Sequence, residues 1–248
     1  MVTIKTDEEI ALMRKANLIV RDALDLVREK IKPGMTTKQV DKLVHDYIVK
    51  CDAVPSFLGY SGYPASACVS IDDEVVHGIP SSNRRIEEGQ IVSVDVGSIY
   101  RGYNGDAART FAIGKVSELK SKLIEVTERS FFEGIKILKE GVRLGDLGHA
   151  IQSYVEANGF SVVRSLCGHG IGTEMHEDPE VLNFGTPGHG LRLKANMTIA
   201  VEPMVNAGAY DVVTLDDGWT VVTRDGKPSA HYENTVAITA DGVEILSL

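Results

Sequence analysis

Cysteine is scarce in this sequence, with three residues among 248 and no Cys-x-x-Cys spacing. An odd, widely spaced set of this kind cannot build the disulfide framework of a small secreted protein or a thiolate zinc site. Cys51, Cys68 and Cys167 instead fit reduced thiols in the cytoplasm.

Long apolar runs are also absent. No stretch approaches the roughly 18 consecutive apolar residues that are needed to cross a bilayer. Asp7, Glu8 and Glu9 stand where a secretory signal would carry its positive and apolar regions. We therefore expect a soluble, cytoplasmic protein with no membrane partner.

Positive charge is in deficit, because 26 Lys and Arg residues face 35 Asp and Glu residues, which gives a net charge of −9. A chain this acidic has no bulk attraction for the phosphate backbone, so nucleic acid is excluded as its main ligand. Hydrophobic residues make up 43% and charged residues 25% of the chain, as in ordinary folded proteins. The length allows one large domain or two small ones.

An internal repeat organises the chain at an offset of 107 residues. Residues 33–49 align with residues 140–156, and both segments place apolar side chains at the i, i+4, i+7 and i+8 spacing of one helical face. At the same offset residues 84–96 align with residues 191–203. Two matches at one offset indicate two related halves.

Each half is predicted to contain two helices followed by β-rich segments. Further helical patterns cover residues 7–31 and 117–138, upstream of the repeated helices. The strand patterns predict one hairpin with its turn at 101–102 in the first half, and an interrupted counterpart in the second. These strands are expected over residues 91–99, 103–113, 197–205 and 232–239.

No flexible linker separates the halves. We therefore expect a single α+β domain, residues 1–248, in which the halves, about 1–114 and 115–248, are related by pseudo-twofold symmetry. The halves should share a curved, mostly antiparallel sheet with helices on its outer face.

Carboxylates stand inside the predicted strands, where apolar residues are expected. Asp95 and Glu202 occupy equivalent positions in the repeat, and Asp106 and Glu233 lie on the second strand of each hairpin. Burying an unpaired carboxylate costs several kcal/mol, so four acids that converge inside a sheet need a positive partner. His169, in the glycine-rich segment CGHGIG, is a candidate nitrogen ligand.

Divalent metal is the interpretation that accounts for all five residues. Four oxygen donors and one nitrogen suit Mn, Fe, Co or Zn, and several bridging carboxylates suggest two ions, which would point to hydrolysis. Two alternatives stay open. One is a thiol site built on Cys167 and His169. The other is a buried ion network with arginines, for which the candidates are Arg84, Arg85, Arg109 and Arg192.

The chain resembles the type I methionine aminopeptidases, the short bacterial form of a metallopeptidase family with the pita-bread fold. The likeness runs along nearly the whole sequence. Five segments carry it: residues 58–80 (LGYSGYPASACVSIDDEVVHGIP), 94–111 (VDVGSIYRGYNGDAARTF), 167–179 (CGHGIGTEMHEDP), 199–208 (IAVEPMVNAG) and 217–235 (DGWTVVTRDGKPSAHYENT).

The resemblance implies a role for each motif residue. Glu202 is expected to act as catalytic acid and base, and His77 and His176 are expected to grip the substrate backbone and stabilise the scissile carbonyl. The implied ligands of two divalent ions, with Asp106 and Glu233 bridging, are Asp95, Asp106, His169, Glu202 and Glu233.

The resemblance also implies an apolar pocket for a methionine side chain. Its lining is expected from Phe57, Tyr60, Tyr63, Cys68, Met175 and Trp219. Four positions depart from the family pattern: Phe57 stands where cysteine is common, Met175 where phenylalanine is frequent, Gly97 where threonine is frequent, and Asn234 where histidine is frequent.

The function that the resemblance implies is removal of the initiator methionine from nascent chains with a small second residue, at the ribosome, by a monomeric enzyme. A metal-bridging hydroxide would attack the first peptide bond. Two alternatives are a proline dipeptidase or Xaa-Pro aminopeptidase on the same fold, which usually carries an extra N-terminal domain, and a metal-free binding module that uses this fold.

Overall fold

The computed structural model describes residues 2–248, and its helices begin where side chains satisfy the free backbone N–H groups. Helix α1 (Asp7–Lys30) starts at a capping box between Thr6 and Glu9, with acidic residues in its first turn and basic residues in its last. Helix α2 (Thr37–Lys50) starts at a second capping box. Helices α3 (Glu118–Ile135) and α4 (Leu144–Ala157) repeat this pair in the second half.

The first half is built on a long hairpin between β4 (Ile91–Tyr100) and β5 (Tyr103–Ala112). Its two-residue turn places Arg101 and Gly102 at φ values of 49° and 85°. Two successive positive φ values match the right-handed twist of a hairpin. Strands β1 (Val54–Pro55) and β2 (Ala67–Ile71) pair with β4, and the 3-10 turn η1 (Tyr60–Gly62) lies between them in sequence.

The predicted strands of the second half are interrupted. Residues 197–205 form β9 (Thr198–Val201) and β10 (Met204–Asn206) instead of one strand, and Pro203, which has no N–H to donate, lies at the break. Residues 232–239 contribute only β14 (Asn234–Ile238), and β13 (Ser229–His231) ends just before them. Both interruptions fall at the predicted ligands Glu202 and Glu233.

Every strand pairing in residues 2–248 is antiparallel, as predicted, but the strands divide into four hydrogen-bonded sheets rather than one. The halves meet where Glu233 N donates to Ala108 O at 3.0 Å. The remaining strands are β3 (Glu74–Val76), β6 (Ser161–Val162), β7 (Gly168–Gly170), β8 (Glu177–Val181), β11 (Val212–Thr214), β12 (Val221–Thr223) and β15 (Val243–Ile245).

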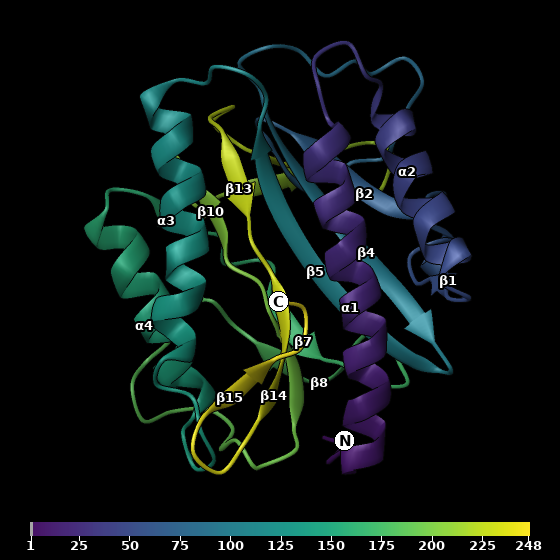
Figure 1. The fold of residues 1–248 in the computed structure, drawn as a ribbon. Helices are drawn as coiled ribbons and strands as arrows, with labels where there is room; N and C mark the ends of the chain where they lie inside the picture. The colour runs from purple at the N-terminus through teal and green to yellow at the C-terminus, as the bar shows by residue number, and fades with distance from the viewer. Residues whose placement is uncertain (1) are drawn as a thin grey trace.

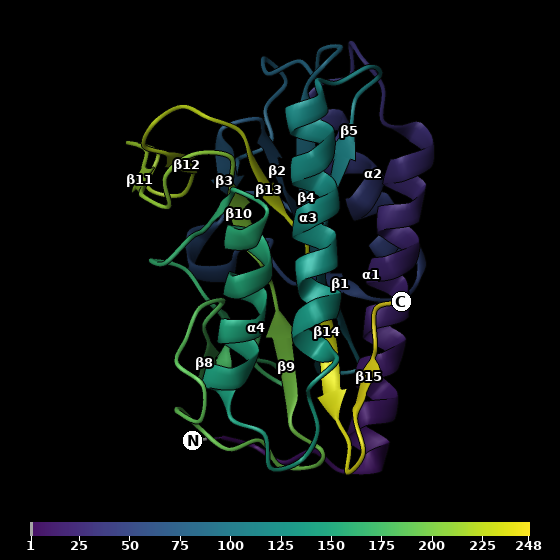
Figure 2. The ribbon, with the colours of Figure 1, turned by 90° about the vertical axis from the view of Figure 1, so that its left-hand side faces the viewer.

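The helices lie on one side of the strand layer. Helices α1 and α3 run in front of the strands of their halves (Figure 1). Turned by 90°, the molecule has α1 at one edge and the β11–β12 hairpin at the opposite edge (Figure 2). That hairpin falls between the strands predicted over residues 197–205 and 232–239, where the second half is interrupted, and it pairs with β3 of the first half. No helix among residues 2–248 has the length and apolar character needed for a membrane span.

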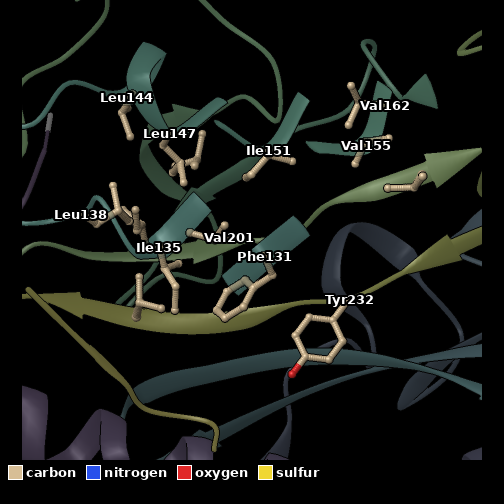
Figure 3. Packing of buried hydrophobic residues seen from close by; sticks show 14 of the residues in the cluster. Phe131, Ile135, Leu138, Leu144, Leu147, Ile151, Val155, Val162, Val201 and Tyr232 are labelled. Carbon is tan, nitrogen blue, oxygen red and sulfur yellow. The ribbon is translucent and has the colours of Figure 1, made fainter. Parts of the chain in front are cut away.

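The core of the second half packs α3 and α4 against the strands (Figure 3). Phe131, Leu147 and Ile151 are fully buried there. Gly134 lets the two helices approach closely, because a Cβ at this position would lie 2.6 Å from Ile151 Cγ1 and 2.9 Å from Leu147 Cδ1. Glu202 and Glu233 lie directly next to the ends of strands behind this core, so the packing helps to fix the positions of both carboxylates.

Leu147→Ala is expected to lower the free energy of unfolding by about 2–5 kcal/mol, because it leaves a cavity in a fully buried cluster. Urea denaturation would measure the change. Leu119→Ala is the matched control, since Leu119 is 48% exposed on α3 and its truncation should cost far less. Equal effects of the two substitutions would contradict this assignment of the core.

Candidate metal centre and substrate pocket

The predicted ligands come together at one cavity. Asp95 on β4 and Asp106 on β5 enter from the first half, and His169 on β7 enters from the second. Glu202 follows β9 and Glu233 precedes β14. All five line a cavity of about 130 Å³.

Strand register explains this convergence. In the β4–β5 hairpin Asp95 lies opposite Ala108, and Asp106 lies opposite Gly97. Ala108 also exchanges backbone hydrogen bonds with Glu233, at 3.0 and 3.4 Å. Acids from segments that are far apart in sequence are therefore neighbours across adjacent strands.

Three of the five residues form the tightest group. Asp106, His169 and Glu233 each present a ligand atom within 4.8 Å of the others. His169 Nε2 lies 3.6 Å from Asp106 Oδ2 and 3.7 Å from Glu202 Oε1. Asp95 lies close enough to Asp106 for each carboxyl group to shift the pKa of the other. The arrangement leaves room between the donors for a cation.

Burial opposes negative charge on these acids. Desolvation raises the pKa of Asp95 to about 7. Desolvation and the neighbouring carboxylates also raise the pKa values of Asp106, Glu202 and Glu233 well above their usual range. Buried oxygens of Asp95, Asp106 and Glu233 have no hydrogen-bond partner among the described residues. Orphaned carboxylate oxygens that face one another fit a site for divalent cations.

His169 is prepared to act as a neutral ligand. Its Nδ1 lies 2.8 Å from Gly170 O, so Nδ1 carries the proton and donates it to that carbonyl. Burial lowers the pKa of the imidazole, so Nε2 keeps its lone pair toward the carboxylates. Fixing the tautomer through the second nitrogen is typical of metal-ligating histidines.

The arginine alternative is wrong. Arg109 donates to Glu233 O and to Asn234 Oδ1, and among residues 2–248 it forms no ion pair with the clustered carboxylates. Arg84, Arg85 and Arg192 have their partners elsewhere, at Glu74, at Gly34 O and at Gly141 O respectively. The charge of Arg109 lowers the pKa of Glu233, but among residues 2–248 none of these four arginines forms an ion pair with the clustered carboxylates.

The thiol alternative also lacks support. Desolvation, together with Glu180 and Glu202, raises the pKa of Cys167 and keeps the group a thiol. A reactive cysteine needs the opposite shift toward the thiolate.

The predicted pocket residues line the same cavity as the acids: Phe57, Tyr60, Tyr63, Cys68, Met175 and Trp219. The Tyr63 and Trp219 rings meet edge to face with centroids 5.1 Å apart. This part of the lining is aromatic.

Two further histidines line this cavity, as predicted. Burial lowers the pKa of His77, and desolvation and His169 lower that of His176 to about 4. Both imidazoles are therefore neutral near pH 7. His176 Nδ1 lies 2.7 Å from the Tyr60 hydroxyl, and the His176 and His169 rings have centroids 4.3 Å apart.

Sequence reasoning missed His231. This side chain is 2% exposed, and its Nε2 lies 3.7 Å from Glu202 Oε2 and 4.0 Å from Glu233 Oε2. Desolvation lowers its pKa to about 3, so it is a neutral imidazole behind two of the acids. The available signal was its spacing, because residues 231 and 233 share one face of an extended segment.

Comparison with known proteins identifies the family of this chain. A model of metallopeptidase family M24 matches residues 11–240. The chain belongs to this family. This M24 metallopeptidase is 56% identical over 248 residues to the methionine aminopeptidase of Clostridium acetobutylicum, and the match covers 100% of this chain and 99% of the relative. The prediction of a metal-dependent hydrolase is confirmed.

Solved structures of relatives confirm the α+β pita-bread fold. The methionine aminopeptidase of Thermotoga maritima superposes with a TM-score of 0.98 at 48% identity, and the match covers 100% of this chain and 99% of the other. A prolidase from Pyrococcus furiosus has a TM-score of 0.77 at 24% identity, and the match covers 99% of this chain and 65% of the prolidase. The prolidase likeness shows a shared fold alone.

Proposed function

We propose that this M24 metallopeptidase removes the initiator methionine from nascent polypeptides whose second residue is small. The observation that carries the proposal is an apolar, aromatic pocket opening directly onto a cluster of orphaned carboxylates. The relatives that match the chain from end to end are methionine aminopeptidases. Hydrolysis at an N-terminal methionine uses both parts of this cavity.

The ligand set we propose for two divalent ions is Asp95, Asp106, His169, Glu202 and Glu233. The oxygen-rich donors suit Co, Mn, Fe or Zn. When bound, such ions lower the pKa of water and polarise a carbonyl. Asp106 and Glu233, which present ligand atoms close to each other and to His169, are the proposed bridging ligands.

Glu202 is the proposed proton carrier. Its side chain is 13% exposed, so it borders the cavity, and its pKa is raised by burial and by Glu233, Asp106 and Asp95. A carboxyl group whose pKa is raised toward neutral pH can take a proton from water and return it to the leaving amine more readily than an ordinary glutamate does. His231 Nε2, behind Glu202, limits the orientations open to that carboxyl group.

Neutral imidazoles would hold the substrate backbone. When the Tyr60 hydroxyl donates to His176 Nδ1, the imidazole proton lies on Nε2 and can be donated to the scissile carbonyl oxygen. His77, whose ring centroid is 6.3 Å from that of Trp219, approaches from the other wall. Both histidines serve as hydrogen-bond donors without bringing a second positive charge to the site.

The pocket dimensions suit one side chain. The cavity of about 130 Å³ includes the space beside the carboxylates, and even as a whole it is no larger than the roughly 150 Å³ apolar cavity that is known to hold a benzene-sized ligand. Aromatic edges and the Met175 thioether favour a flexible, polarizable side chain such as that of methionine. We also propose that residues 1–248 form a single catalytic domain that works as a cytoplasmic monomer on chains emerging from the ribosome.

Metal affinity is expected to weaken as the pH falls. Asp95 has a pKa of about 7 in the metal-free protein, so below that pH a metal ion must displace its proton. For each proton that the metal must displace, the metal affinity falls by about tenfold for every pH unit below the raised pKa. Titration calorimetry with Mn²⁺ between pH 8 and 5, in buffers of different ionisation enthalpy, would count the released protons. Affinity that does not change over this range would contradict the ligand assignment.

Peptide substrates test the function directly. After chelation and reloading with Mn²⁺ or Co²⁺, the enzyme should release free methionine from Met-Ala-Ser and leave an Ala-Pro peptide intact. Cleavage of the Ala-Pro peptide alone would instead assign an Xaa-Pro peptidase. A purified protein that binds no metal and cleaves neither peptide would support a binding module and overturn the proposal.

A further inference from the structure

Gly97 and Phe57 occupy the same space from two sides. A Cβ at Gly97 would lie 2.7 Å from Phe57 Cε1, 3.0 Å from Ser56 Cβ and 3.2 Å from Phe57 Cδ1. Gly97 lies within strand β4 and has no positive φ. Its backbone conformation therefore does not itself require glycine, and the space for a side chain is taken chiefly by the Phe57 ring, together with Ser56 Cβ.

The backbone beside Phe57 is held in place, so this segment cannot simply shift away from strand β4. Ser56 N donates to Gly97 O at 3.0 Å, and Ser56 Oγ donates to Asn104 Oδ1 at 3.0 Å. Asn104 in turn donates through Nδ2 to the carbonyls of Gly172 and Thr173, both at 3.1 Å. A side chain at position 97 would therefore displace the ring rather than the backbone.

The substrate pocket offers free space for that displacement. Phe57 lines the cavity and is only 9% exposed, so its ring already forms part of the wall. Gly97 lies opposite Asp106 in the hairpin, which places this wall beside the carboxylates. The cavity lining also includes Met175, which follows the segment that Asn104 holds.

We propose that Phe57, backed onto Gly97, sets the width of the substrate pocket and restricts it to an unbranched side chain of methionine's length. This inference rests on the proposed aminopeptidase function. The two positions act as one unit: a larger residue at 97 requires a smaller one at 57. Shortening Phe57 alone opens the pocket to branched side chains.

Four variants test the pair: Phe57→Cys, Gly97→Ala, the double variant, and Phe111→Cys as control. Phe111 is buried to a similar extent, 7% exposed, but packs in the core of the first half. Each Mn²⁺-loaded enzyme is assayed with Met-Ala-Ser and Leu-Ala-Ser, and free L-methionine binding is measured by calorimetry. Thermal melting records the stability of each variant.

Phe57→Cys should raise kcat/KM for Leu-Ala-Ser relative to Met-Ala-Ser by about tenfold or more, because a change of a single methylene in an apolar pocket already has an effect of that size and the lost ring is larger. Gly97→Ala should weaken methionine binding by about tenfold or more and raise KM more than it lowers kcat. The double variant should recover methionine binding, because the added methyl group then meets no ring. Phe111→Cys should lose stability with no change in the Leu to Met ratio.

Additive effects of the two substitutions in the double variant would overturn the inference, as would an unchanged Leu to Met ratio in Phe57→Cys. If Gly97→Ala fails to fold, rescue of folding by Phe57→Cys supports the steric unit and absence of rescue contradicts it. Failure of the proposed function is distinguishable, because it would appear as a wild-type enzyme that does not cleave Met-Ala-Ser.

Discussion

Replacing Glu202 with glutamine is expected to lower kcat by about 10²–10⁴-fold, the usual contribution of a positioned acid and base. The amide keeps the shape of the side chain and an oxygen donor, but it can neither take a proton from water nor return one to the leaving amine. Metal content should be at least partly retained, because four of the five proposed ligands are unchanged. Steady-state kinetics on Met-Ala-Ser, together with elemental analysis of the same samples, would measure both effects.

Glu180→Gln is the matched control for this experiment. Glu180 is exposed and lies opposite His169 in the β7–β8 pairing, so the same chemical change is made one strand away from the cluster. Its activity should stay close to that of the wild type. A Glu202→Gln enzyme with nearly normal kcat would remove Glu202 from the proton-transfer role.

Chelation of the metal should reduce activity by at least about 10³-fold, because polarising the carbonyl and activating water are together worth several kcal/mol. Activity should return when Mn²⁺ or Co²⁺ is added. In Asp106→Asn, added metal should not restore activity, because Asp106 belongs to the tightest group of ligand atoms. Elemental analysis should find two ions per wild-type chain and fewer in the variant.

Asp146→Asn controls for the loss of one negative charge, because Asp146 is a helix-capping residue that bonds to Arg143 N and Gly188 N. It should bind metal as the wild type does. One ion per wild-type chain at saturating metal would contradict the dinuclear proposal, although the family assignment would stand. Full activity of thoroughly chelated protein would contradict metal dependence itself.

Periodicity and the repeat predicted the elements that depend on local pattern. The predicted helix over 7–31 is observed as Asp7–Lys30. The predicted hairpin is also observed, and its turn lies at residues 101–102 as expected. These features follow from side-chain spacing and turn chemistry, which are local properties of the chain. The set of converging acids was also predicted, because a buried carboxylate is costly wherever the strand lies.

The sequence did not predict features that depend on contacts between distant segments. The strand breaks at Glu202 and Glu233 and the division into four sheets arise from how the halves meet. The position of His231 behind Glu202 also depends on that meeting. Phe57 and Gly97 looked like separate departures from the family pattern. Their steric relation appears only when β4 and the segment before η1 are placed side by side.

The division of the ligands between the two halves has an evolutionary consequence. Asp95 and Asp106 belong to the first half, whereas His169, Glu202 and Glu233 belong to the second. Arg109 of the first half also donates to the backbone of Glu233 in the second. Each half by itself lacks part of the ligand set, so an ancestor limited to one half could not have assembled this five-residue centre from a single copy.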